Sequence, residues 1–352
     1  MSNSHSGSSV AGTSISILGS NISRLLAAFA FLVFAPACSV ESTSTPEPVT
    51  RRAADGPSPS LLERLRLAPA DLENAPLHEV LGCDGSWIDI VVLPGTLQLK
   101  QAELEHWVLA SSSAVCGWFG HFPVKYLFVV VKPGRGRGVG GGMTVGLGDT
   151  AGIRISLSER ATINSLRTDW VLVHEMVHTA IPNLPEQNHW FEEGAATYIE
   201  AVARVRAGLN TTDAFWYELI DTYGNGVPRP GEGGLDDTPT WGRTYYGGAI
   251  YFLLADIAIR ERTQGKKSLR DAMIGIVEEL HGITNDSDMD HVIAAADRAS
   301  GVPVFRELYD RMAHHAEPVD LNALWKELGV ARKGRSVTYD DGAPKAWVRK
   351  SY

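Results

Sequence analysis

Residues 170–178 read Trp-Val-Leu-Val-His-Glu-Met-Val-His, and they say more about the fold than any other part of this chain. An apolar run leads into an H-E-x-x-H pentad, and residues four apart lie on one face of a helix. His174 and His178 can therefore share one metal ion, while Glu175 stands beside them to take a proton from a metal-bound water. Such pentads also arise by chance, so a third ligand is needed before the pattern predicts a metal site.

Catalytic zinc sites use three protein ligands and keep the fourth position for water. The metzincin arrangement takes a later histidine that follows a glycine, but Leu184 and Ile181 occupy those two positions here. His189 is close in sequence, although it falls in the loop before the next predicted helix. The other known arrangement takes a glutamate from that next helix.

Residues 190–200 read Trp-Phe-Glu-Glu-Gly-Ala-Ala-Thr-Tyr-Ile-Glu and provide that glutamate. The stretch resembles the W-x-x-E-G-x-A-x-Y signature of the gluzincin metallopeptidases, which include thermolysin-like and aminopeptidase-like zinc enzymes. The resemblance implies that Glu193 is the third zinc ligand, with Trp190 and Tyr198 at the flanking aromatic positions. It also implies an α+β fold, a thermolysin-like zincin catalytic domain in which a small mixed sheet precedes a helical body. Without the pentad, Glu192 and Glu193 would be ordinary acids in the first turn of a helix.

A second match is the run Tyr245-Tyr246-Gly247-Gly248. It resembles the Y-x-x-G element of the glycyl aminopeptidase-like gluzincins, in which the tyrosine hydroxyl donates to the developing oxyanion. The resemblance implies this role for Tyr245, with Tyr246 as the alternative. Two tyrosines that only pack in the core are the other interpretation. The likeness is specific over 165–330 and faint over 85–160.

One departure from the family concerns the substrate. Aminopeptidases of this type carry a Gly-Gly-x-Glu-like strand before the pentad, and its glutamate pairs with the free amine of the substrate. Residues 141–145 read Gly-Gly-Met-Thr-Val, so Thr144 stands at the glutamate position. A neutral hydroxyl cannot supply ionic recognition of an amine. Endopeptidase and aminopeptidase activity both stay open, and a plain hairpin loop is the alternative interpretation of the glycine run.

The N-terminal residues have the features of an export signal. Arg24 precedes the apolar run 25–35, which is too short to span a bilayer, and small residues surround Cys38. A signal peptide of the lipoprotein type is therefore predicted over 1–38, with Cys38 as the lipidated residue; Ala35 replaces the usual leucine and leaves simple secretion open. We expect a membrane-anchored lipoprotein of the bacterial cell envelope, or else a secreted or periplasmic protein, that meets the membrane only through its lipid.

Composition excludes some classes of function. The chain has 352 residues, a formal net charge of −9 and no long basic run, so we do not expect it to bind nucleic acid. In an exported protein, the cysteines that remain after processing favour one disulfide, here between Cys83 and Cys116. Two buried free thiols are the alternative.

Strand patterns come first along the chain, and helix patterns follow. Residues 87–93 and 125–131 have the composition of strands, and the alternation over 152–157 is typical of an edge strand. Residues 134–148 are predicted to be a glycine-rich loop. The predicted organisation is a signal peptide over 1–38, a disordered tether over 39–60, a β-rich subdomain over 61–160, a helical zinc peptidase subdomain over 161–335 and a C-terminal tail over 336–352.

The sequence also indicates where the helix that carries the pentad begins and ends. Asn164, Ser165 or Thr168 can cap it, and Pro182 can stop it. Glu200 is spaced to support a ligand histidine from the next helix, but a solvent-exposed helix face is the simpler expectation for it.

These features together predict zinc-dependent hydrolysis of peptide bonds. In this hypothesis His174, His178 and Glu193 hold Zn²⁺, and Glu175 takes the proton of the water and passes it to the leaving amine. Tyr245 stabilises the oxyanion.

A peptide or protein substrate would add to the predicted edge strand over 152–157. The rival hypothesis is a non-catalytic surface lipoprotein that keeps the zincin fold as a binding module. The intact Glu175 argues against that rival, because a binding module has no need of a general base.

Overall fold

The computed structural model describes residues 57–73 and 75–352. The predicted signal peptide with Cys38, and most of the predicted tether, lie outside the described residues. Pro59, near the end of that tether, begins the first helix, α1 (Pro59–Arg64). No helix in the described part of the chain is long and apolar enough to cross a membrane.

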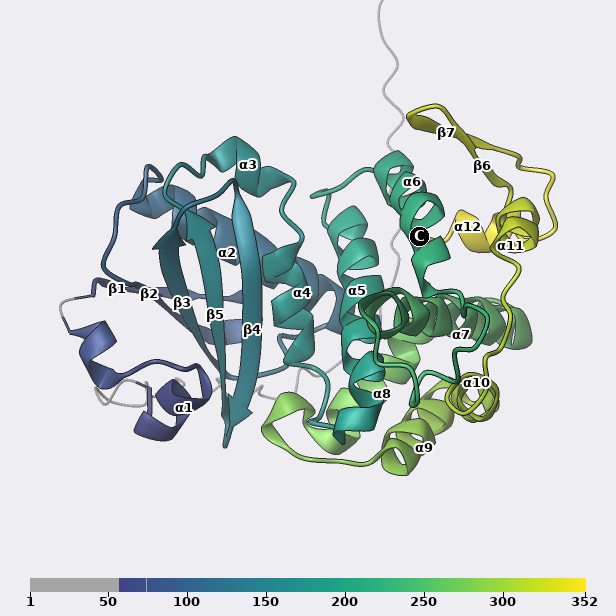
Figure 1. Cartoon of the computed structure of the whole chain (residues 1–352), viewed down its shortest axis with the longest axis horizontal. Coiled ribbons are helices and arrows are strands. Elements are labelled where there is room, and N and C mark those ends of the chain that lie inside the picture. The colour runs from purple at the N-terminus through teal and green to yellow at the C-terminus, as the bar shows by residue number, and fades with distance from the viewer. Residues whose placement is uncertain (1–56, 74) are drawn as a thin grey trace, which may run out of the picture. The chain divides into compact units, whose positions relative to one another are not determined.

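The expected α+β fold, a sheet followed by a helical body, is confirmed (Figure 1). The strands are β1 (Leu77–Leu81), β2 (Trp87–Val92), β3 (Tyr126–Gly134), β4 (Val139–Leu147), β5 (Thr150–Ser158), β6 (Val330–Lys333) and β7 (Ser336–Tyr339). The longer helices are α2 (Gln101–Phe119), α4 (Val171–His178), α5 (His189–Arg206), α6 (Thr212–Thr222), α7 (Gly248–Thr263), α8 (Leu269–Leu280), α9 (Met289–Ser300), α10 (Val304–Met312) and α11 (Leu321–Leu328). The short helical segments that matter below are α3 (Ile163–Arg167), α12 (Ala346–Arg349), the 3₁₀ turn η2 (Cys83–Gly85) and the π-helical turn η5 (Gly242–Gly247).

A five-stranded sheet has the order β1-β2-β3-β5-β4. Strands β2, β3 and β5 are parallel, while β1 and β4 pair antiparallel at the two edges. Two expectations were wrong. Residues 152–157 belong to β5, an inner strand between β3 and β4, and residues 139–147 form the edge strand β4 where a glycine-rich loop was expected.

The glycines of β4 explain why the sequence pattern did not predict this strand. The run from Gly140 to Gly142 has no side chains to give an alternating pattern, and glycine is depleted in strands. The strand forms because β5 provides a continuous partner from Gly142 to Leu147, with one irregularity between Val139 and Gly142.

Helix α2 covers one face of the sheet and lies behind it in the view of Figure 1, while the short α1 packs against part of the opposite face. On the face covered by α2, Trp107 of α2 and Ile90 of β2 belong to the main core, which continues into the helical body. On the opposite face Leu61 and Leu65 of α1 pack with Phe128 of β3 in a small second core. The sheet is therefore a fixed support for the strand at its edge, β4.

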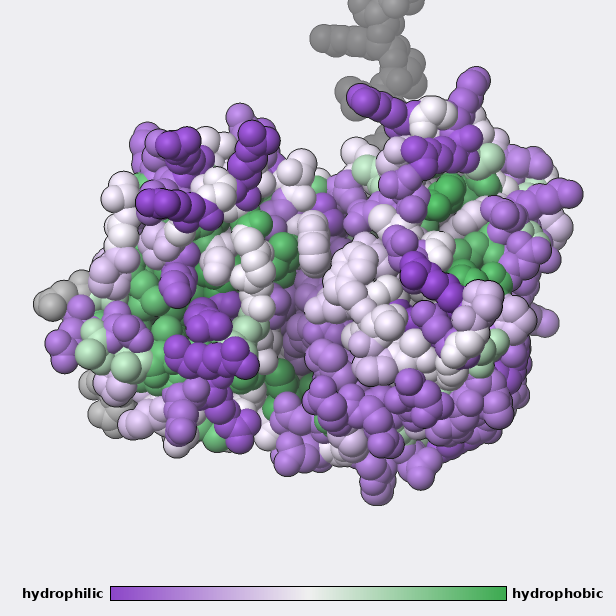
Figure 2. Space-filling model, viewed as in Figure 1, coloured by the Kyte–Doolittle hydropathy of each residue, from purple (hydrophilic) through white to green (hydrophobic). Residues whose placement is uncertain are grey.

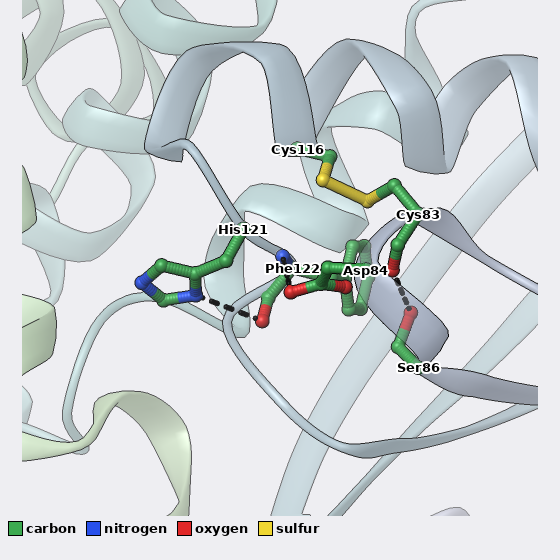
Figure 3. The surroundings of a disulfide bond; sticks show 6 residues. All are labelled: Cys83, Asp84, Ser86, Cys116, His121 and Phe122. Carbon is green, nitrogen blue, oxygen red and sulfur yellow. Dashed lines mark hydrogen bonds between the residues drawn. A yellow bond between two sulfur atoms is a disulfide. The ribbon is translucent and has the colours of Figure 1, made fainter. Parts of the chain in front are cut away.

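A disulfide joins Cys83 of η2 to Cys116 in the last turn of α2 (Figure 3). Two hydrogen bonds order the chain beside it: Ser86 Oγ donates to the carbonyl of Cys83 at 3.0 Å, and the N–H of Phe122 donates to Asp84 Oδ2 at 3.2 Å. The bridge therefore ties the start of β2 to the helix that covers the sheet.

Helix α4, which carries the pentad, begins later than expected. The carboxylate of Asp169 accepts from the N–H groups of Val171 at 3.1 Å and Leu172 at 3.2 Å. The helix ends at His178, and Pro182 follows in the next loop. The expected caps of this helix lie in or next to α3 instead: Asn164, Ser165 and Thr168.

Two glycines let α5 and α7 cross in direct backbone contact. A Cβ atom on Gly194 would overlap the backbone of Gly248, and one on Gly248 would overlap the carbonyl of Trp190. Because η5 continues directly into α7, this crossing sets how close η5 comes to α5.

The residues expected to be a C-terminal tail, 336–352, are part of the fold. They contain β7, which pairs with β6, and α12. The hydroxyl of Tyr352 lies 2.8 Å from that of Tyr198, which also donates to Asp256 at 3.0 Å.

Candidate metal centre

Helices α4 and α5 bring the three predicted ligands together. His174 and His178 lie one turn apart on α4, with ring centroids 4.9 Å apart and Nε2 atoms 3.3 Å apart. Glu193 comes from the N-terminal part of α5. Its Oε2 lies 3.0 Å from Nε2 of His174 and 3.6 Å from Nε2 of His178.

These separations fit one metal ion held by all three side chains. A tetrahedral zinc site with ligand bonds of about 2.0–2.1 Å has roughly 3.3–3.4 Å between ligand atoms. The three measured separations, 3.0, 3.3 and 3.6 Å, lie around that value. Imidazole nitrogen and carboxylate oxygen are also donors that zinc accepts. His174, His178 and Glu193 are therefore suited to hold a divalent metal ion, and zinc matches the donor set.

Burial and the neighbouring charges act in opposite directions on the pKa values of these ligands. Burial disfavours ionisation of Glu193, but His178 and His174 outweigh it and hold the pKa of Glu193 well below its usual range. Burial also disfavours a charged His178, yet Glu193 and Glu175 reverse the shift and raise the pKa of His178 to about 9. Since a ligand histidine must be neutral, a metal ion that binds at neutral pH displaces a proton from His178.

The second ring nitrogen of His174, Nδ1, has no hydrogen-bond partner on α5. Nδ1 of His174 is buried, and no described residue forms a hydrogen bond with it. Glu200 does not reach this nitrogen. Nor is it solvent-exposed, which was the simpler expectation for it. It is only 3% exposed, and its Oε2 lies 3.2 Å from Nη1 of Arg204.

The expected general base, Glu175, faces strand β4. Its side chain is buried, and Thr144 Oγ1 lies 2.6 Å from its Oε2 and 3.0 Å from its backbone carbonyl. Gly142 adjoins the same carboxylate, because a Cβ atom on that glycine would overlap it. Glu175 therefore borders the cavity beside the ligands, where a base must be.

Tyr245 reaches the trio from the π-helical turn η5, a rare conformation that is frequent at functional sites. Its ring stacks on that of His174 with centroids 6.1 Å apart, and its hydroxyl lies near the carboxylate of Glu193. Burial and the nearby carboxylates raise the pKa of Tyr245, so the hydroxyl stays protonated and can donate. Tyr246, the alternative, packs near Tyr223 instead.

The other candidates beside the trio have different contacts. Glu192 accepts from the N–H of Leu184 at 2.9 Å, and its Oε2 lies 2.9 Å from Nδ1 of His189. Nε2 of His189 is 3.4 Å from Oε1 of Glu193. Glu192 therefore orders the loop before α5, and His189 supports Glu193 from outside the ligand trio.

The site borders a cavity of about 290 Å³. In Figure 2 the surface is hollowed between β4 and the helical body, and much of the hollow is hydrophilic. A larger cavity, about 450 Å³, lies beside β6 and β7 and contains none of the predicted ligands. The lining of the smaller cavity is Gly142, Met143, Thr144, His174, Glu175, His178, Ile181, Asn183, His189, Glu192, Glu193, Tyr245 and Ile283.

Known proteins resemble this chain in structure rather than in sequence. No protein-family model matches the sequence, and no curated protein matches it either. The crystal structure of an aminopeptidase N family protein from Idiomarina loihiensis aligns with a TM-score of 0.56 at 17% identity, over 73% of this chain and 49% of that one. The chain has a gluzincin-like fold. An M1 zinc metallopeptidase from Deinococcus radiodurans aligns with a TM-score of 0.45 at 15% identity, over 70% and 52% of the two chains. The chain spans about half the length of these structures.

The gluzincin-like fold gathers the predicted ligands, Glu175 and Tyr245 around one cavity. The sequence did not reveal that Thr144 binds Glu175 or that Gly142 makes room for it. The one available signal was the position of residues 141–145 in the family pattern, which pointed to the substrate and not to the base.

Proposed function

We propose that this protein is a zinc-dependent metallopeptidase that hydrolyses peptide bonds. The observation that carries the proposal is the convergence of Nε2 of His174, Nε2 of His178 and Oε2 of Glu193 at separations of 3.0 to 3.6 Å. The carboxylate of Glu175 borders the same cavity, so a metal site and a base stand together. The gluzincin-like fold supports the same reaction.

Each residue of the site has one task in this reaction. His174, His178 and Glu193 would hold the zinc ion, which when bound would make its water more acidic and polarise the scissile carbonyl. Glu175 accepts a proton from the attacking water and delivers it to the leaving amine. Tyr245 donates a hydrogen bond to the oxygen that gains negative charge in the transition state.

Strand β4 supports the proposal because its backbone can align a substrate. It is an edge strand, so one side of its backbone has no partner strand within the described sheet. Gly142 and Thr144 bring this strand directly beside Glu175. A peptide that adds to β4 as a further strand would lie along the cavity, held by its main chain and free to vary in sequence.

We infer further that the enzyme acts on internal peptide bonds. Recognition of a terminal ammonium requires a carboxylate that is free to pair with it. The three carboxylates that line the cavity are already engaged: Glu175 by Thr144, Glu193 by the histidines and Glu192 by the N–H of Leu184. A terminal ammonium group would therefore have to share a carboxylate that already has a partner.

A mixed peptide library with free and blocked N-termini tests this function. We expect the zinc-loaded full chain to cleave blocked peptides internally, and Glu175→Gln to keep zinc while its kcat falls about 10²–10⁴-fold. Glu186→Gln, at an exposed position between α4 and α5, is the control and should cleave like the wild type. Bound zinc without cleavage of any peptide would reject the peptidase and favour a non-catalytic binding module.

We also propose that the protein is exported and anchored through a lipid on Cys38. The support is the sequence of residues 1–38 alone. In a bacterial host, the full chain should fractionate with membranes and be released by detergent, whereas Cys38→Ser should be found in the soluble fraction. Full-length protein that stays in the cytoplasm would contradict export.

A further inference from the structure

We infer that Thr144 is a positioning residue that orients the carboxylate of Glu175 for proton transfer, an inference that rests on the proposed peptidase function. Oγ1 of Thr144 lies 2.6 Å from Oε2 of Glu175. A hydroxyl has one proton to donate, and the carboxylate is nearer than the backbone carbonyl of Glu175 at 3.0 Å. Among residues 57–73 and 75–352, Thr144 is the one hydrogen-bond donor to this carboxylate.

The strand that carries Thr144 also fits the other side of the carboxylate. Gly142 and Thr144 are two residues apart in β4, so they face the same way. A Cβ atom on Gly142 would overlap Oε1, Cδ and Cγ of Glu175. Gly142 therefore leaves room for the carboxylate, and Thr144 binds it there.

Strand β4 is held in place by its neighbours. Thr144 can therefore keep the carboxylate of Glu175 in one position. Thr144 pairs with Ile153 of β5, and Ile153 is fully buried. Further along the strand, Gly146 lies against the backbone of Ile283, with no space for a side chain. A glutamate side chain has several rotatable bonds, and a base that is misplaced by about 1 Å can lose on the order of 10²-fold in rate.

Three variants distinguish the effect of the Thr144 hydroxyl from the effects of side-chain shape and of substitution in the sheet. Thr144→Val keeps the shape and removes the donor, whereas Thr144→Ser keeps the donor. Thr150→Val is the matched control, because the hydroxyl of Thr150 contacts Asp149 outside the cavity. We expect Thr144→Val to lower kcat by about 10–100-fold with KM changed by less than about 3-fold, and Thr144→Ser to recover most of kcat.

Zinc content and crystal structures of the same full-length variants provide readouts apart from activity. Thr144→Val should retain one zinc per chain while the carboxylate of Glu175 leaves its position or splits into two conformers. Thr144→Ser should keep that carboxylate in place.

An unmoved carboxylate or an unchanged kcat in Thr144→Val would overturn the inference. Loss of zinc from Thr144→Val would overturn it too, because the residue would then act on the metal centre. If the wild-type chain cleaves no peptide, the proposed function fails, while the crystal structures still decide whether Thr144 orients Glu175.

Discussion

At the scale of single residues, the site depends on which of two similar neighbours faces the cavity. Glu193 approaches both histidines, whereas the adjacent Glu192 binds the backbone of the preceding loop. Tyr245 and Tyr246 differ in the same way, because only the first stacks on His174. Consecutive residues of a helix point in different directions. The second member named in each pair, which faces away from the ligands, can therefore serve as the control for the first.

The tyrosine pair gives the first prediction. Tyr245→Phe should lower kcat by about 10²-fold or more, because a lost oxyanion donor typically costs about 3 kcal/mol in the transition state. Zinc content should not change, since all three ligands stay. Tyr246→Phe is the matched control and should retain the wild-type kcat in the same steady-state assay. Equal losses in the two variants would show that Tyr245 has no special role.

How much of the site could be predicted depended on whether each contact was local. His174 and His178 were predictable because their spacing belongs to one helix. Glu193 and Tyr245 required the family resemblance, because their approach to the histidines depends on how other helices pack. The bond from Thr144 to Glu175 joins residues 31 positions apart and depends on the placement of β4 beside α4, which no local pattern encodes.

At the scale of elements, close backbone approaches decide where the site residues stand. Strands β2, β3 and β5 follow their sequence patterns, but β4 does not, because its stability comes from pairing with β5 rather than from strand propensity. The crossing of α5 and α7 at Gly194 and Gly248 is similar: the sequence contains the glycines, but only packing shows that they touch. That crossing brings η5, and with it Tyr245, to Glu193.

The helix crossing gives the second prediction. Gly194→Ala should lower the free energy of unfolding by about 1–3 kcal/mol, because the new methyl group overlaps the backbone of α7. Gly117→Ala is the control, since that glycine is exposed in α2 with open space around its Cβ position. It should gain about 0.5–1 kcal/mol from reduced backbone entropy. Urea unfolding measures both, and a neutral Gly194→Ala would contradict the close crossing.

At the scale of the whole described chain, a buried acid links stability to pH. Burial raises the pKa of Glu200 from its ordinary 4.5 to about 8, even though Arg204 lies 3.2 Å away and favours the ionised form. The folded state therefore keeps a proton that the unfolded state releases near pH 4.5. This contribution to stability is complete below pH 4.5 and is lost as the pH rises toward 8.

The pH dependence of unfolding is the third prediction. Between about pH 5 and 8, wild-type protein should lose stability relative to Glu200→Gln, with a slope of up to about 1.4 kcal/mol per pH unit. The variant removes the titrating group, so the comparison depends on the slope and not on the absolute stability. Denaturant unfolding at several pH values measures it. Parallel curves for the two proteins would show that Glu200 does not titrate in this range.

The metal centre is the central claim, and zinc titration of the metal-free full-length chain tests it most directly. One zinc should bind per chain, and Glu193→Ala should weaken binding by more than about 100-fold, beyond the usual effect of losing an outer-shell partner. Glu192→Ala, which alters the adjacent acid, should stay within about 10-fold of the wild type. Zinc bound by Glu193→Ala as tightly as by the wild type would contradict the site.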